Sequence, residues 1–295
     1  TGERHLIDLA SPEALDAFLD GVDVLITCVG PFAQLGMPVV EAAVRTGLPY
    51  VDSTGEPAFM AEVYDRFRSA PTAVVPACGF DYIPGDLGVA VAVEELGHPA
   101  EEIDVVYAMS GAKVTRGTAL SGVGAFTTMR PQLGRLVVAG EKGPVPAVRL
   151  PWGEELTVPL HQPQATVATG VAAPDWVTKV TQTVGPLAGH AAPLVKLAGP
   201  LLSRWADRLP EGPSEESRSK ANAQTYSVVR GAGGEARVVV RVRDVYGITA
   251  RFLVAASQQI AGKGAMAPAE ALSARAFLDS VAYDDEGGSL SWSVL

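Results

Sequence analysis

Three segments in which a short apolar run breaks into Gly, Pro and acidic residues constrain the fold more than any other feature. They are Val22–Pro31, Leu48–Glu56 and Ala73–Asp86. Each leads into a stretch with helical character, which is how a parallel α/β sheet presents its ligand-facing loops. The segments therefore predict a βαβαβ unit, and its connections are expected to be parallel and right-handed.

The first hundred residues alternate between strand and helix signals. We expect an opening strand at residues 4–10 and then a helix at Ser11–Leu19, where Ser occupies the N-cap and Pro the first helical position. The remaining strands are expected at Val22–Val29, Tyr50–Asp52 and Ala73–Pro76. The remaining helices are expected at Met37–Thr46, Pro57–Arg68 and Asp86–Leu96.

The pattern changes after Gly97. Alternating apolar and polar residues predict further strands, and the glycines of Gly231–Gly234 predict a hairpin between two of them. These strands are expected at Ile103–Ser110, Thr157–Thr166, Gln224–Arg230 and Glu235–Val242. Helices are expected at Gly117–Leu136, Asp175–Leu209, Thr249–Ala261 and Pro268–Leu278. The later part of the chain therefore predicts a second domain on a mostly antiparallel sheet.

Composition excludes several classes of function. The chain has 295 residues, 47% of them hydrophobic, and a net charge of -10, which fits a soluble globular protein and argues against a nucleic-acid surface. Its two cysteines, Cys28 and Cys78, cannot make a disulfide framework and fit a reduced, cytoplasmic location. Buried small hydrophobes are one interpretation of them, and a redox pair is the other if their strands are neighbours.

Two turns at the ends of predicted strands are candidate ligand sites, because ligands of open parallel sheets bind outside the carboxyl ends of the strands. In the first, Gly30 would let backbone approach a ribose or a nicotinamide while Pro31 stiffens the turn. A simple strand-ending Gly-Pro explains it equally well. In the second, Asp52–Glu56 offers hydroxyl and carboxylate groups to sugar hydroxyls, and helix capping is the alternative.

The third turn, Cys78–Asp86, is the most unusual. Phe80 and Ile83 are candidates to form the wall of a pocket for a flat ring, and Asp81 or Asp86 to cap the following helix. Elsewhere, the glycines of Gly122–Thr127 lie within a predicted helix and so fail the context of a dinucleotide loop. The four histidines show no metal-ligand spacing, so no metal site is predicted.

Taken together, two segments resemble the saccharopine dehydrogenase-like oxidoreductases. They read VGPFAQLGMPVVEAAVRTGLPYVDSTGE and ACGFDYIPGDLG. Later elements are similar to the same family, and the G-P-S-x-x-x-R and Y-G-x-T-A segments most resemble its trans-acting enoyl reductase branch. These later elements are Arg116–Ser121, Gly212–Arg218 and Asp244–Ala250.

The resemblance implies an α/β fold in two parts. An incomplete Rossmann-type parallel sheet (residues 1–100, rejoined by a helix near 245–262) precedes an α+β substrate domain (101–244) and a C-terminal segment (263–295). The glycine-rich loop of the family is not in this sequence, which begins at Thr1, so we expect that the N-terminal part of the Rossmann domain is missing. The resulting open sheet edge favours a homodimer.

The resemblance also implies an NADP- or NAD-dependent reduction of an enoyl or imine-type group. The residues placed at the cofactor are Gly30, Pro31, Phe32, Cys78, Gly79, Phe80 and Asp81. Gly117 and Thr118 would face it from the substrate domain, and Asp81 and Tyr82 are candidate proton donors.

The substrate is then a small molecule or a lipid-linked group. The apolar stretch between Trp176 and Trp205 would suit an acyl chain if it forms a groove, although a packed helical core is the favoured explanation. Contact with a membrane surface is a further option that the sequence leaves open. The competing class is a non-catalytic Rossmann-like interaction or scaffold protein.

Overall fold

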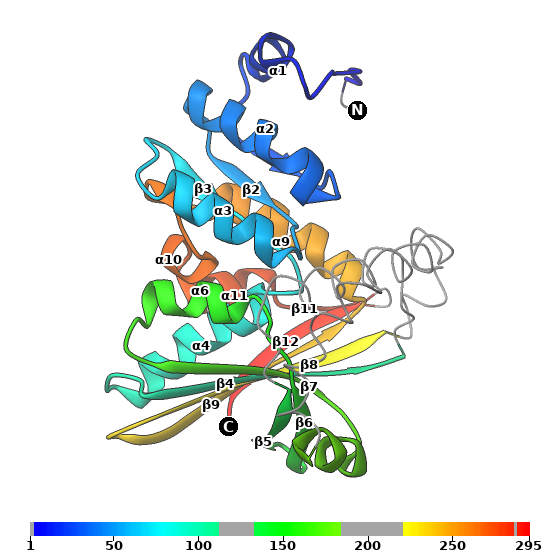
Figure 1. The fold of residues 1–295 in the computed structure, drawn as a ribbon, viewed down its shortest axis with the longest axis vertical. Coiled ribbons are helices and arrows are strands. Elements are labelled where there is room, and N and C mark those ends of the chain that lie inside the picture. The colour runs from blue at the N-terminus through cyan, green and yellow to red at the C-terminus, as the bar shows by residue number, and fades with distance from the viewer. Residues whose placement is uncertain (1–2, 112–132, 184–220, 286–287) are drawn as a thin grey trace.

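Two β-sheets organise the residues that the computed structural model describes, namely 3–111, 133–183, 221–285 and 288–295 (Figure 1). A four-stranded parallel sheet has the order β1-β2-β3-β10, and an eight-stranded, mostly antiparallel sheet has the order β11-β12-β9-β8-β4-β7-β6-β5. The small sheet comprises β1 (Leu25–Thr27), β2 (Tyr50–Asp52), β3 (Ala73–Val75) and β10 (Gly264–Ala265). The large sheet comprises β4 (Glu102–Ser110), β5 (Gly134–Gly140), β6 (Gly143–Arg149), β7 (Thr166–Ala172), β8 (Asn222–Gly231), β9 (Gly234–Arg243), β11 (Tyr283–Asp284) and β12 (Ser289–Val294).

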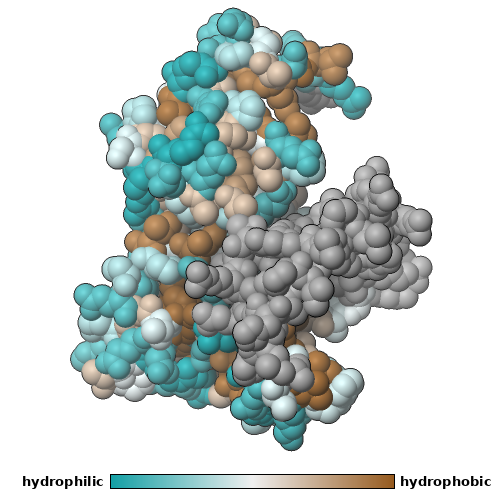
Figure 2. All heavy atoms as spheres, viewed as in Figure 1, coloured by the Kyte–Doolittle hydropathy of each residue, from teal (hydrophilic) through white to brown (hydrophobic). Residues whose placement is uncertain are grey.

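The small sheet confirms the predicted parallel βαβαβ unit, since β1 pairs with β2 and β2 with β3 in parallel. Its central strands β2 and β3 are covered on both faces. Tyr50 and Val74 pack with residues of α2 (Phe32–Thr46) and α3 (Pro57–Phe67). Val51 and Val75 face the other way, toward a core that includes α9 (Val245–Gln259). Hydrophilic residues predominate on the outer side of α2 and α3 (Figure 2).

The opening strand expected at residues 4–10 is not formed, so β1 lies at one end of the sheet order. Part of this segment instead packs on α1 (Pro12–Leu19), where Ile7 and Leu9 meet Leu15. The predicted start of α1 is confirmed, because the side chain of Ser11 accepts a hydrogen bond from the Ala14 amide at 3.2 Å.

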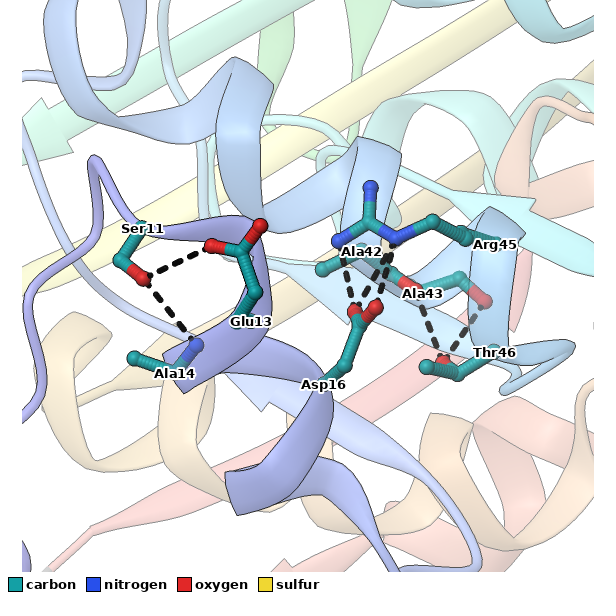
Figure 3. Close-up of polar contacts among 8 residues, drawn as sticks. All are labelled: Ser11, Glu13, Ala14, Asp16, Ala42, Ala43, Arg45 and Thr46. Carbon is teal, nitrogen blue, oxygen red and sulfur yellow. Dashed lines mark hydrogen bonds and ion pairs between the residues drawn. The ribbon is translucent and has the colours of Figure 1, made fainter.

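An exposed ion pair links α1 to α2. The Arg45 guanidinium of α2 reaches the Asp16 carboxylate of α1, with 2.6 Å between Nη2 and Oδ1 (Figure 3). Thr46, in the last turn of α2, donates its hydroxyl to the Ala42 carbonyl at 2.8 Å. The ion pair on this flank of the small sheet therefore lies in solvent.

The large sheet confirms the mostly antiparallel second unit. Its only parallel pair among the described residues is β4 with β7, and α4 (Ile83–Leu96) packs on β8 and β9. The predicted strand at 157–166 is wrong. Its first five residues end α6 (Glu154–His161), whose buried Glu154, Thr157 and Val158 have helical spacing.

Three further differences concern helix bounds. Residues 134–136, expected in a helix, begin β5, and residues 117–132 of that predicted helix lie outside the described residues. The helices α2, α4 and α9 begin three to five residues earlier than expected. The predicted helix at 268–278 is divided into α10 (Pro268–Ala271) and α11 (Ala274–Val281).

A helical prediction for 175–209 is confirmed for residues 175–183, and its remainder, with most of the apolar stretch, lies outside the described residues. Within the described ranges, the helices are all too short or too polar to cross a bilayer.

Candidate functional site

The carboxyl ends of β1, β2 and β3 meet at one edge of the small sheet, because the three strands run parallel and in register. The three turns that the sequence singles out follow these strands. The tip of the first turn, Cys28–Pro31, is exposed, whereas most of the third turn, residues 76–83, is buried. The sheet thus brings the three candidate turns to a common edge.

Asp52 fastens the end of β2 to the end of β3. Its Oδ1 accepts hydrogen bonds from the backbone amides of Thr54 and Ala77, both at 2.8 Å, and its Oδ2 accepts one from the Tyr50 hydroxyl at 2.7 Å. Ala77 has a left-handed φ of 63°, a conformation that a non-glycine residue adopts only when its surroundings hold it. Burial raises the pKa of Asp52 to about 6 despite these donors.

Glu56 holds the end of the turn that follows β1, where α2 begins. Its two carboxylate oxygens accept hydrogen bonds from the amides of Phe32 and Ala33, at 2.8 and 2.9 Å, so they cap the N-terminus of α2. The Thr54 hydroxyl accepts from the Glu56 amide at 3.1 Å. Asp52 and Thr54 are fully buried and used internally. The interpretation that these two residues bind sugar hydroxyls is therefore wrong. The alternative, helix capping, holds for Glu56, which caps α2.

The backbone of the turn after β3 is held by three other elements. The Cys78 amide donates to the Asp52 carbonyl of β2 at 2.7 Å. The Phe80 amide donates to the Thr249 hydroxyl of α9 at 3.1 Å. The Asp81 carbonyl accepts from the Tyr107 hydroxyl of β4 at 2.8 Å. Hydrogen bonds from both sheets thus fix this turn.

Most side chains of this turn face the core. Cys78, Phe80 and Ile83 are buried, and the Phe80 ring lies edge-on to Tyr107 with 6.1 Å between centroids. The predicted pocket wall of Phe80 and Ile83 side chains is therefore wrong. Tyr82 is also buried, which raises the pKa of its hydroxyl and removes it as a proton donor to a ligand.

Asp81 is the exception, because its side chain is exposed. The protein around it nevertheless raises the pKa of Asp81 to about 6 through desolvation. Such a carboxyl holds a proton for part of the time near neutral pH, which suits proton transfer.

The other predicted site residues divide into two groups. Gly30 and Pro31 are exposed, and a Cβ built on Gly30 would meet nothing nearer than the Phe32 ring at 3.8 Å. Phe32 itself packs on Phe59, with 5.5 Å between ring centroids, so its side chain belongs to the core. Gly79 is buried between Thr249 and Ser53.

Gly117 and Thr118 lie outside the described residues. Cys28 is exposed and Cys78 is buried, and their strands are separated by β2. The condition for a redox pair is therefore not met. Within the described ranges, His, Cys, Asp and Glu form no group of three or more that could hold a metal.

Sequence reasoning missed the buried polar groups Glu154, Tyr107 and His161 behind the turn, and it was wrong about Asp81 or Asp86 as a cap of the following helix, since α4 has no side-chain cap. Asp86 accepts from the Ala269 amide at 2.7 Å and contacts the His161 Nε2 at 3.1 Å. Burial lowers the pKa of His161, but the carboxylates of Asp86 and Glu270 together raise it by more. Glu154 stands in an acidic, helix-like stretch that resembles a surface helix, so no local signal shows that it is buried.

Comparisons with known proteins place these features in context. A saccharopine dehydrogenase-like oxidoreductase of Bos taurus is 28% identical over 151 residues, which are 48% of this chain and 35% of the relative. A trans-acting enoyl reductase of Mycobacterium leprae is 38% identical over 86 residues, which are 28% of this chain and 21% of the relative. This chain resembles the saccharopine dehydrogenase-like oxidoreductases.

The fold agrees with this resemblance. An apo saccharopine dehydrogenase (L-Glu forming) of Saccharomyces cerevisiae superposes with a TM-score of 0.54 at 13% identity, over 98% of this chain and 88% of that one. The matched segments span only about a fifth to a third of the curated saccharopine dehydrogenase-like relatives and enoyl reductases. No protein-family model matches the chain.

Proposed function

We propose that this chain is part of an NAD(P)-dependent oxidoreductase that uses Asp81 as the proton donor. The observation that carries the proposal is the position of Asp81, an exposed carboxyl with a pKa of about 6 on a turn that both sheets hold rigid. General acids work best when their pKa lies near the working pH. The relatives named as oxidoreductases and enoyl reductases support the same reaction class.

The residues at this edge fit one end of a nicotinamide dinucleotide. Gly30 presents exposed backbone with open space where a side chain would project, which suits approach by a ribose or a nicotinamide ring. The N-terminus of α2 does not suit a diphosphate, because Glu56 already occupies the amides of Phe32 and Ala33. We therefore propose that the cofactor is NAD or NADP and that its nicotinamide half binds at the turn that contains Gly30.

The bound cofactor would supply a hydride to one carbon of a polarised double bond. The role of Asp81 is to deliver a proton to the other atom of that bond and to regain it from solvent. Tyr107 and Thr249 hold the Asp81 turn in place through its carbonyl and the neighbouring amide, so that the carboxyl keeps one position. An enoyl or imine-type group on a lipid-related substrate is the proposed acceptor, in keeping with the enoyl reductase relatives.

Titration with NADPH and with NADH tests the proposal. Binding is followed by quenching of tryptophan fluorescence in the wild-type protein, in Gly30→Leu and in the control Gly134→Leu, which changes a glycine of β5 in the other sheet. We expect saturable micromolar binding of one nucleotide, weakened at least tenfold by Gly30→Leu and unchanged by Gly134→Leu. Absence of binding to both nucleotides would contradict the proposal and favour a non-catalytic interaction protein.

A second measurement concerns the proton donor. Once a reducible substrate is found, Asp81→Asn is expected to lower kcat by about 10² to 10⁴-fold, the usual contribution of a general acid. Nucleotide affinity should stay within about twofold, because the isosteric change leaves the backbone contacts of the turn intact. An unchanged kcat would remove Asp81 from the mechanism.

A further inference from the structure

Behind the Asp81 turn lies a buried carboxyl for which the proposed reaction has no use. Glu154, in the first turn of α6, is fully buried and contacts the Tyr107 hydroxyl through Oε1. Its other oxygen, Oε2, is buried without a hydrogen-bond partner among the described residues. The same Tyr107 hydroxyl reaches the Asp81 main-chain carbonyl at 2.8 Å. One phenol therefore joins the buried carboxyl to the turn that carries the candidate proton donor.

The hydrogens in this arrangement can be counted. A tyrosine hydroxyl has a single proton to donate, and a main-chain carbonyl can only accept. The Tyr107 proton must therefore lie on the Asp81 side, and the contact between Tyr107 and Glu154 needs a second proton, which only Glu154 can provide. An ionised Glu154 would take the Tyr107 proton for itself and leave the Asp81 carbonyl without this donor.

The surroundings of Glu154 favour the same protonation state. Burial raises its pKa well above the usual range, and although the Tyr107 hydrogen bond opposes this, the nearby acidic groups Asp86 and Asp81 raise it further. One glycine makes room for the contact between Glu154 and Tyr107, and a second, next to Glu154 in the chain, makes room for the Tyr82 ring. A Cβ on Gly85 of α4 would overlap Glu154 Oε1 and lie 2.8 Å from the Tyr107 oxygen, and one on Gly153 would overlap the Tyr82 ring.

We propose that Glu154 is a neutral carboxylic acid that positions Asp81: it donates a hydrogen bond to Tyr107, which in turn donates to the Asp81 carbonyl. Glu154 and Tyr107 are thus positioning residues that act from α6 and β4 on a turn that follows β3. The inference rests on the proposed function for the importance of Asp81, but the hydrogen-bond chain itself needs no cofactor. Its test can therefore be made on the protein alone.

Infrared spectroscopy tests the protonation state of Glu154. The protein is prepared with ¹³C-labelled glutamate, and the spectrum at pH 7 is compared between the wild type and Glu154→Gln. We expect the wild type to show a protonated-carboxyl stretch that shifts with the label and disappears in the variant. Loss of a carboxylate band instead would mean that Glu154 is ionised and would overturn the proposal.

Nuclear magnetic resonance of the aspartate carboxyl carbons tests the coupling to Asp81, whose signal is assigned with Asp81→Asn. In the wild type we expect a titration midpoint of about 6. Glu154→Gln should leave it within a few tenths of a unit, because a carboxamide still donates to Tyr107 and no charge is lost. Tyr107→Phe should move it toward about 4, the value of a hydrated aspartate.

A matched control shows whether the change in the Asp81 midpoint is specific to Tyr107 or follows the removal of another tyrosine hydroxyl. Tyr226 lies on β8 opposite Val106, packs in a separate core cluster and donates to Gln224 Oε1 at 2.7 Å. Tyr226→Phe should leave the Asp81 midpoint unchanged. A fall of the midpoint in Glu154→Gln, or none in a folded Tyr107→Phe, would refute the proposal. If Tyr107→Phe does not fold, the infrared result and Glu154→Gln still decide.

The outcomes also separate this inference from the proposed function. A neutral Glu154 in a protein that binds neither NADH nor NADPH would retain the hydrogen-bond chain and reject the oxidoreductase. Nucleotide binding by a protein with an ionised Glu154 would support the oxidoreductase and reject the hydrogen-bond chain.

Discussion

The turns after β1 and β3 lie at the same edge of the small sheet but are held in different ways. Polar groups of β2, α9 and β4 form hydrogen bonds with the backbone of the turn after β3. One of these groups, the Asp52 carboxylate, is fully buried. The turn after β1 is exposed, and its main anchor is the Glu56 carboxylate on the first amides of α2. The outer side of α2 carries exposed ion pairs, Arg45 with Asp16 and Glu41 with Arg66.

The difference teaches which polar contacts matter for the site. A buried polar group that loses its partner costs far more than an exposed one, because water cannot replace the partner. The turn after β3 should therefore be rigid and sensitive to mutation, whereas the turn after β1 can adjust to a ligand. Four expected outcomes test this contrast, in order of decreasing size.

Removal of the buried anchor should have the largest effect. Asp52→Ala leaves the amides of Thr54 and Ala77 and the Tyr50 hydroxyl without an acceptor, and we expect a loss of about 3 to 5 kcal/mol in the free energy of unfolding. At pH 4, where the wild-type Asp52 is also protonated in the folded state, Asp52→Asn keeps two acceptor contacts and can donate to Tyr50, so it should stay within about 1 kcal/mol of the wild type. Urea denaturation measures both. Equal stabilities of the two variants would contradict a hydrogen-bonding role.

The protonation of Asp52 should make this comparison depend on pH. Its folded pKa of about 6 lies above the unfolded value of about 3.9, so the folded state binds the proton more tightly. The stability due to this group is fully present below pH 4 and is lost as pH rises through 6. Relative to the wild type, Asp52→Asn should gain up to about 3 kcal/mol between pH 4 and pH 7. A constant difference across this range would show that burial does not perturb Asp52.

The exposed turn should respond more weakly. Glu56→Gln removes the charge and one of the two acceptors for the amides of Phe32 and Ala33, and we expect a loss of about 1 to 2 kcal/mol. Hydrogen exchange should increase at those two amides and not at Phe80. Glu62→Gln, an exposed change on α3, is the control and should have little effect. Faster exchange at Phe80 as well would mean that the two turns form one unit.

The smallest effect should come from the ion pair between α1 and α2. Both Arg45 and Asp16 are exposed, so water and salt replace their contact and Arg45→Gln should leave the melting temperature unchanged. Leu15→Ala, which empties a buried position of the same helix, should cost about 2 to 4 kcal/mol and shows that the assay detects a loosened α1. A clear fall in the melting temperature of Arg45→Gln would show that exposed polar contacts also stabilise this protein.

Local sequence signals predicted the parallel unit and its turns well. Pro and Gly at helix ends, Ser11 at an N-cap and the glycines at 231–234 act within a few residues, so their effects can be read along the chain. The errors arose where pattern and packing disagree. Residues 157–161 alternate like a strand but lie in a helix, whose buried residues Glu154, Thr157 and Val158 follow a helical spacing. Residues 4–10 form no strand.

By itself, the sequence determined the kind of sheet and the order of the turns, because apolar runs bounded by Gly, Pro and acidic residues leave few other arrangements. The resemblance to oxidoreductases likewise lay in contiguous motifs. Only the tertiary structure decided which members of each motif are available to a ligand. Asp52 and Tyr82 are buried and Asp81 is exposed, because partners distant in the chain, such as Tyr107 and the glycine at 153, define the space around them.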